Sequence, residues 1–248
     1  MSETIRYPRI DAMPVVTTEQ MIEVDRRMMD DVGISLFQMM ENAGLLLASI
    51  ARDLFLKGDV TGKRIAVMVG TGGNGGGAIV AARRLVSWGA QCDIGFGRSK
   101  ADLAEVPRAQ FGILERISKI KLIEPSAVGG DYDLIIDGLI GYSLKGAPHG
   151  RTAEFIGAAN KSKVPVLSLD VPSGFDGTQG QFREPSIDAD ATMTLALPKF
   201  GMMAQDRPAG IGRLFCADIS CPPVVYENLG IDMAYEIPFV KSPIVELS

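Results

Sequence analysis

The chain has 248 residues, a hydrophobic fraction of 46% and a formal net charge of −5 at pH 7. We expect one domain over residues 1–248, with a core of about residues 16–220 and an extended tail, residues 221–248, lying over the sheet. Its acidity argues against nucleic-acid or membrane partners. Three cysteines without a CxxC pair, no membrane-length apolar run and no signal-peptide pattern predict a cytoplasmic protein with reduced thiols.

Two helices are predicted at the start of the chain. Thr17 and Gln20 fit a capping box, apolar residues recur after them at helical spacing, and this helix should end near Gly33. A second helical stripe covers residues 36–57, with a glycine stop at Gly58. Two helices therefore precede the first strand.

Apolar runs then recur and predict strands that begin near Arg64, Gln91, Lys119, Tyr132, Val164 and Ala191. Residues 78–89 have a helical pattern, and the segments between the other strands are long enough for crossovers. We therefore predict an α/β protein, a Rossmann-like three-layer α/β/α sandwich with a largely parallel sheet, preceded by two N-terminal helices. In such a sheet, ligands bind beyond the carboxyl ends of the strands, where strand order reverses.

The first strand leads into GTGGNGGGA, residues 70–78, in which six of nine positions are glycine. Glycine leaves backbone N–H groups open to a diphosphate, although it can also serve only to relieve crowding in a tight turn. Gly70, Gly72 and Gly75 match the GxGxxG of dehydrogenases. The acidic residue that this fingerprint requires after the second strand is replaced by GRSK, residues 97–100, whose two basic side chains are candidates for phosphate contact.

Charged residues follow three later strands. Asp137 and Asp170 each end a strand, and Lys199 follows the next one. Either aspartate could simply cap the following helix, but two at the same edge of a parallel sheet favour a site. Lys199, placed before a tight turn, could meet a carboxylate or a phosphate.

Five segments in this order resemble the NAD(P)H-hydrate epimerase family, a YjeF N-terminal-like domain often fused to an NAD(P)H-hydrate dehydratase. They are EQMIEVDRRMMDDVGISLFQMMENAG, GTGGNGGGA, DGLIGYSLKG, SLDVPSG and ADATMTLALPKFG. The resemblance implies an isomerase, often a homodimer, that interconverts the R and S epimers of hydrated NADH and NADPH. It also implies a bound potassium ion, with no other cofactor expected.

The resemblance further implies roles for individual residues. Asp170 would be the catalytic carboxylate and Lys199 its partner. Asn74, Asp137 and Ser173 would hold or support potassium. The implied substrate-binding residues are Asp170, Gly72, Gly73, Asn74, Gly75, Gly76, Gly77, Gly141, Tyr142, Ser143, Leu144, Lys145, Gly146 and Ala147.

The first glycine segment departs from the family pattern. Relatives usually carry NNGGDG, whereas residues 73–78 read GNGGGA, so Gly77 stands in place of an aspartate. A helix N-terminus without that acid should still bind phosphate, with altered specificity. A non-catalytic nucleotide- or protein-binding module with a degenerate loop therefore remains an alternative.

An NAD-dependent dehydrogenase is a further alternative. The missing ribose-binding acid opposes it, and so does the lone histidine, His149, which lies in a turn. Because the chain contains no dehydratase-like segment, we expect the functionally coupled dehydratase to be a separate protein.

Overall fold

The computed structural model describes residues 7–204, 207–231 and 238–248. Its strands are β1 Arg9–Ile10, β2 Arg64–Val69, β3 Gln91–Phe96, β4 Lys121–Leu122, β5 Leu134–Gly138, β6 Val166–Leu169, β7 Phe175–Asp176, β8 Gln181–Phe182, β9 Ala191–Leu195, β10 Arg213–Ala217 and β11 Ile244–Leu247. Its α-helices are α1 Thr18–Arg27, α2 Leu36–Ile50, α3 Gly73–Ser87, α4 Glu105–Ile117 and α5 Gly150–Lys161. Short 3-10 helices cover Lys100–Asp102, Pro125–Ala127, Phe200–Met203, Ala209–Ile211, Pro223–Tyr226 and Pro238–Val240.

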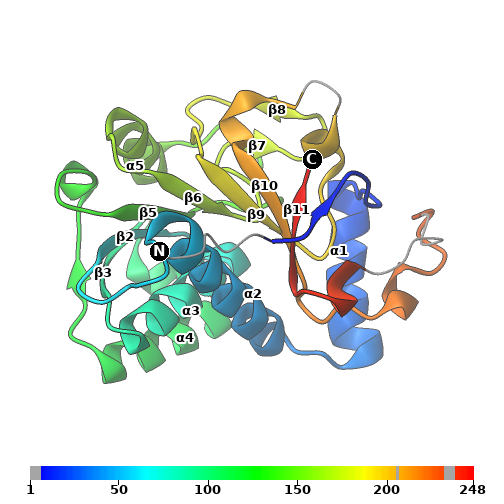
Figure 1. The fold of residues 1–248 in the computed structure, drawn as a ribbon, viewed down its shortest axis with the longest axis horizontal. Helices are drawn as coiled ribbons and strands as arrows, with labels where there is room; N and C mark the ends of the chain where they lie inside the picture. The colour runs from blue at the N-terminus through cyan, green and yellow to red at the C-terminus, as the bar shows by residue number, and fades with distance from the viewer. Residues whose placement is uncertain (1–6, 205–206, 232–237) are drawn as a thin grey trace.

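The described strands other than the β7–β8 hairpin form one sheet in the order β1-β11-β10-β9-β6-β5-β2-β3-β4. All neighbours are parallel except β10 and β11. Figure 1 shows α2, α3 and α4 on one face of the sheet and α5 on the other. The predicted three-layer sandwich with a largely parallel sheet is therefore confirmed.

The strand order reverses between β2 and β5. From β2 the chain moves outward through β3 to β4, then returns across β2 to build β5, β6, β9 and β10. The segments that leave β2 and β5 therefore diverge, which opens a crevice beyond their carboxyl ends.

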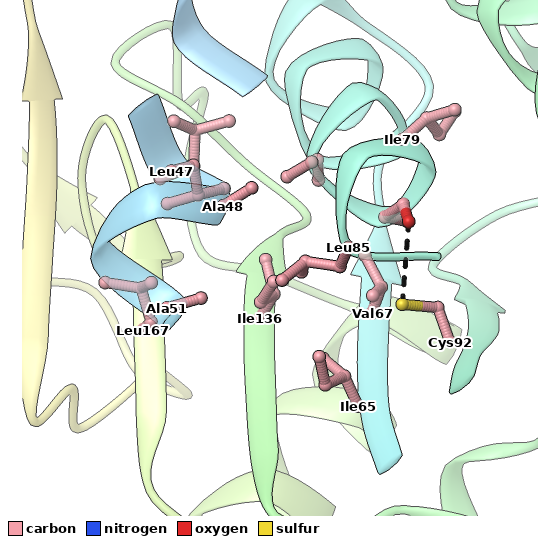
Figure 2. Close-up of a cluster of buried hydrophobic side chains, with 14 of the residues drawn as sticks. Leu47, Ala48, Ala51, Ile65, Val67, Ile79, Leu85, Cys92, Ile136 and Leu167 are labelled. Carbon is pink, nitrogen blue, oxygen red and sulfur yellow. Dashed lines mark hydrogen bonds between the residues drawn. The ribbon is translucent and has the colours of Figure 1, made fainter. Parts of the chain in front are cut away.

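A tightly packed core joins α2 and α3 to the sheet (Figure 2). Leu47, Ala48 and Ala51 of α2 and its continuation face apolar side chains of β2, β5 and β6, and all three are fully buried. Gly44 lies at the crossing with α3, where an added Cβ would come within 2.4 Å of Val80. The small residues of α2 thus allow a close helix crossing, which fixes α3 and the segment that precedes it.

The two N-terminal helices form as predicted. Gln20 N donates to Thr17 Oγ1 and Thr17 N to Gln20 Oε1, which completes the capping box. α1 continues as a π-helical turn, Met28–Val32, which ends at Gly33 with φ +83°. A second π-helical turn, Ala51–Phe55, extends α2 and ends close to the predicted stop.

The start of α3 differs from its prediction. The helical pattern indicates a start at Ala78, but α3 begins at Gly73, so much of the glycine segment is helical. Glycine has a low helix propensity, and these residues are helical because they pack against β2 and α2. An added Cβ on Gly75 would lie 2.0 Å from the Gly70 carbonyl oxygen, and one on Gly76 would lie 2.5 Å from Met40 Sδ.

The prediction that residues 221–248 form an extended cover over the sheet is also partly wrong. Residues 232–237 lie outside the described residues, but Ile244–Leu247 form β11 inside the sheet, between β10 and β1. β11 is a continuous buried apolar strand except for Glu246, which pairs with Arg9 and Arg213. The sheet thus extends beyond residues 16–220 at both ends of the chain. Within the described ranges, no helix has the length and apolarity needed to cross a bilayer.

Candidate active site

A cavity of about 790 Å³ opens at the carboxyl ends of the central strands. One wall is built from the segments that follow β2, β5, β6 and β9, and the other from α1 and the start of α2. The cavity lies where strand order reverses, the position at which doubly wound sheets bind ligands. Its volume is typical of small-molecule and cofactor sites.

A buried ion pair lies at the strand-end wall of this cavity. The Lys199 ammonium contacts the Asp170 carboxylate and also donates to Thr194 Oγ1 at 3.1 Å and Leu195 O at 3.3 Å. Lys199 is 0% exposed and Asp170 is 4% exposed. The segments that follow β6 and β9 thus place two opposite charges in contact. Each charged group is hydrogen-bonded, as is needed when a charge is buried.

Asp170 is held in an uncommon backbone conformation. Its φ is +68°, in the left-handed region that is unfavourable for a residue with a Cβ. Its Oδ2 accepts a hydrogen bond from Tyr142 N at 3.0 Å, and a Cβ on Gly141 would lie 3.1 Å from the same oxygen. Glycine at 141 therefore allows the loop after β5 to approach Asp170. Strain at a buried charged residue in a cavity is typical of a functional site.

Asp137 lies behind the cavity wall and organises it. Its two oxygens accept hydrogen bonds from Ser168 Oγ, Ser173 Oγ, Ser173 N and Leu139 N at 2.6–3.2 Å. Burial raises the pKa of the Asp137 carboxyl, while these hydrogen bonds favour its charged form. Ser173 Oγ also accepts from Ile140 N at 2.9 Å. The aspartate therefore ties the loop after β5 to the loop after β6.

Asn74, in the first turn of α3, lines the cavity with an unpaired amide. Among the described residues, neither Oδ1 nor Nδ2 has a hydrogen-bond partner, although both atoms are buried. An unsatisfied buried amide is destabilising by about 1–3 kcal/mol, so such a group at a cavity wall suggests a ligand. The carbonyl oxygen of Asn74 fits an oxygen-seeking cation. The described residues contain no cluster of three or more His, Cys, Asp or Glu side chains suited to a metal.

The glycines of the first loop divide into two groups. Gly70 and Gly75 relieve crowding, since a Cβ on Gly70 would lie 1.9 Å from Leu139 O. Gly72 is exposed with nothing within 4 Å of an added Cβ, and Gly73 is exposed with only Met40 Cε, at 4.0 Å. These two residues leave the N-terminus of α3 open toward the cavity, where its backbone N–H groups can bind an anion. Both interpretations of the loop therefore apply: Gly70 and Gly75 relieve crowding, while Gly72 and Gly73 leave backbone N–H groups open to an anion.

Most of the predicted site residues come together in the cavity. The residues that line it are Gly72, Gly73, Asn74, Gly77, Gly141, Tyr142, Ser143, Leu144, Lys145, Ala147, Asp170 and Lys199. The residues that do not line it are Gly75, Gly76, Gly146, Asp137 and Ser173. The second set lies behind the wall or, for Gly146, on the exposed part of its loop.

The basic residues after β3 lie at a neighbouring cavity of about 660 Å³. Arg98 is exposed and lines both cavities, together with His149. Lys100 is paired with Glu115 at 2.6 Å. Arg98 is therefore the better placed of the two predicted phosphate contacts.

Sequence reasoning missed the contribution of the first helix. Met21, Ile22 and Asp25 of α1 line the cavity. Asp25 follows Met21 by four residues and so shares the buried face of the helix. A charge on an otherwise apolar face was the signal that could have identified it.

The fold and the cavity define a Rossmann-like α/β protein with a ligand crevice at its switch point and a buried aspartate–lysine pair. Residues 36–201 match the family of the YjeF-related protein N-terminus. This match covers more than half of the chain, which therefore belongs to the YjeF N-terminal, or NAD(P)H-hydrate epimerase, family.

An NAD(P)H-hydrate epimerase of Dehalogenimonas lykanthroporepellens is 38% identical, with 96% of this chain and 94% of that protein aligned. A bifunctional NAD(P)H-hydrate repair enzyme of Moorella thermoacetica is 33% identical over 85% of this chain, which spans 41% of that larger protein. The crystal structure of the yeast protein YNL200c has a TM-score of 0.76 at 24% identity, covering 95% of this chain and all of the yeast chain. This last likeness establishes the fold.

Proposed function

We propose that this protein is an NAD(P)H-hydrate epimerase, which interconverts the R and S epimers of hydrated NADH and NADPH. The Dehalogenimonas relative, similar over nearly its whole length, carries that name. The observation that carries the proposal is the buried Asp170–Lys199 pair at the wall of a cavity large enough for a nucleotide.

The reaction requires proton transfer to the oxygen that leaves and from the oxygen that enters. The substrate carries a hydroxyl on a ring carbon next to the ring nitrogen, so its configuration inverts when water leaves, giving an iminium-like species, and returns on the other face. Asp170 exchanges a proton with one of these oxygens, a role that typically contributes about 10²–10⁴-fold. Lys199, fixed by Thr194 and Leu195, holds the Asp170 carboxylate in place.

The diphosphate of the substrate lies at the open N-terminus of α3, against Gly72 and Gly73. The loop after β5, residues 141–147, lies along the same cavity and supplies Lys145, which lines it. This placement leaves the hydrated nicotinamide ring beside Asp170.

A potassium ion fits the residues present. Asn74 would hold it through its unpaired amide oxygen, with Asp137 and Ser173 supporting the loops around it. When bound, the ion would supply positive charge beside the diphosphate and fix the two loops. A monovalent ion is a weak Lewis acid, so proton transfer remains with the protein side chains.

The test is an epimerisation assay on purified hydrated NADH and NADPH. A dehydratase that consumes only one epimer is added, and consumption of the second epimer is followed with and without potassium. Faster consumption that is lost in Asp170→Asn supports the proposal. If the protein leaves the rate unchanged but binds NADP⁺ by calorimetry, it is a non-catalytic binding module with a degenerate glycine loop.

Three further properties belong to the proposal. Coupling to a dehydratase on a separate chain is suggested by the bifunctional relatives, which carry a repair-enzyme name over a longer chain. We also propose a cytoplasmic homodimer. Light scattering of the purified protein tests the dimer, and fractionation of the source cells tests the location.

A further inference from the structure

A second carboxylate lines the cavity on the wall opposite the strand ends. Asp25 of α1 is half-buried, and the Tyr142 hydroxyl donates a hydrogen bond to its Oδ2. The backbone N–H of the same tyrosine donates to Asp170 Oδ2 at 3.0 Å. Tyr142 thus connects the two carboxylates, and their separation is set by the span of one tyrosine from its nitrogen to its hydroxyl.

The position of Asp25 is fixed relative to the ion pair. Val16 forms a parallel bridge with Lys199, through Val16 N to Pro198 O at 3.0 Å and Phe200 N to Val16 O at 2.9 Å. The capping box of α1 begins at the next residue, Thr17. α1, and Asp25 with it, is therefore anchored to the strand end that carries Lys199.

The surroundings of Asp25 favour its neutral form. Burial is the largest effect and raises the pKa of its carboxyl, the charge of Asp170 acts in the same direction, and Lys199 and the Tyr142 hydrogen bond oppose it. The adjacent Arg26 turns away and binds Glu23 and Asp31. Among the described contacts, Asp25 therefore has no ion-pair partner, whereas Asp170 has Lys199.

Epimerisation by loss and return of water involves both faces of a ring. The leaving hydroxyl must gain a proton on one face, and the entering water must lose one on the other. A single fixed carboxylate reaches one face of a bound ring, so a group on the opposite wall is placed to serve the other face. The cavity offers two carboxylates on two walls, with different environments, the arrangement that separates an acid from a base.

We propose that Asp25, with the Tyr142 hydroxyl, is this second catalytic group and serves the ring face opposite Asp170. The inference rests on the proposed function. In one direction the Asp25 carboxyl gives its proton to the substrate hydroxyl, the carbon–oxygen bond breaks with its electron pair leaving on water, and the ring-nitrogen lone pair forms the C=N bond.

Water then attacks the same carbon from the other face, the C=N electrons return to nitrogen, and the released proton passes to Asp170. The reverse reaction exchanges the two roles. Between turnovers the proton returns from Asp170 to Asp25 through solvent in the open cavity, so the enzyme is restored without any other reactant.

The test compares the wild type with Asp25→Asn, Tyr142→Phe and Asp30→Asn. The last is a matched control on the same helical segment, with a side chain that is 64% exposed. The coupled assay gives kcat and KM as a function of pH, calorimetry gives the Kd for NADP⁺, and thermal melting reports folding. Tyr142→Phe keeps the aromatic ring and the backbone N–H that binds Asp170 while removing only the hydroxyl.

We expect Asp25→Asn to lower kcat by about 10²-fold or more and to lose one limb of the wild-type pH profile. Tyr142→Phe should lower kcat by a smaller factor, with Kd unchanged in both variants and Asp30→Asn equal to the wild type. An unchanged kcat in Asp25→Asn overturns the inference, as does a change confined to KM and Kd, which would make Asp25 a positioning residue. An inactive wild type overturns the proposed function itself.

Discussion

The Lys199 ammonium and the Asp170 carboxylate form a buried ion pair at the cavity wall, in which the lysine is 0% exposed and the aspartate 4%. Removing one partner leaves a buried charge without compensation, which is destabilising by about 3–5 kcal/mol. We expect Asp170→Asn and Lys199→Met each to lose stability of this order in urea unfolding. The double variant should lose less than the sum of the two, and strict additivity would show that the charges are not coupled.

Gly75 should not tolerate a side chain, although it lies inside a helix. Alanine normally stabilises a helix by about 1 kcal/mol relative to glycine. A Cβ at this position meets the backbone of Gly70, which cannot move without displacing β2. Gly75→Ala should therefore be destabilising by about 1–3 kcal/mol. Gly72→Ala, with open space around it, is the control and should stay within about 0.5 kcal/mol of the wild type in the same denaturant experiment.

Gly77 is coupled to Leu169. A Cβ on Gly77 would lie 2.8 Å from Leu169 Cδ2, and the leucine is fully buried. We expect Gly77→Ala to be destabilising by about 1 kcal/mol or more, and Gly77→Asp, the residue usual in relatives, by a larger amount. Adding Leu169→Val removes the contacting carbon, so the combined loss in thermal or urea unfolding should be smaller than the sum. If the two losses of stability were fully additive, Gly77 and Leu169 would not be energetically coupled.

Potassium should stabilise the folded protein through Asn74. A ligand that binds only the folded state raises stability with its concentration. Melting in potassium chloride should therefore occur at a higher temperature than in sodium chloride of equal ionic strength, and Asn74→Ala should remove the difference. Asn42→Ala, which loses only a surface hydrogen bond to Ser220, is the control. An equal salt response in Asn74→Ala would exclude this asparagine as a ligand.

Asp25 should make stability depend on pH. Burial raises the pKa of its carboxyl above the usual 3.8, so the folded state binds the proton more tightly than the unfolded state. Its contribution is fully present below pH 3.8 and is lost as pH rises through the raised value. The Asp25→Asn variant has no ionisable side chain at this position. As pH rises through this window, the measured free energy of unfolding of the variant should therefore increase relative to that of the wild type. A difference that stays constant with pH would contradict the raised pKa.

Much of the site could be predicted because parallel strands end at one edge. Asp170 and Lys199 each follow a strand in the sequence, and the strand order alone brings them together. The Thr17–Gln20 capping box is likewise local, so it could be predicted from the sequence. Those features depend on periodicity and on residues a few positions apart, which is the information that a single sequence carries.

The remaining features depend on packing between distant residues. α3 begins at Gly73 because glycines allow contact with β2 and α2, and propensity alone argues against a helix there. β11 joins the sheet through partners that lie early and late in the chain. The hydrogen bond between the Tyr142 hydroxyl and Asp25 joins residues 117 positions apart, so no local pattern predicts it.

The pairing of β1 with β11 has a consequence for biosynthesis. Arg9 pairs with Glu246, so β1 has its partner strand 237 residues further along the chain. Before β11 is synthesised, one edge of β10 is unpaired and β1 has no partner strand in the sheet. Unpaired strand edges are prone to associate with other chains, and here they are covered only when residues 244–247 pair with both β1 and β10.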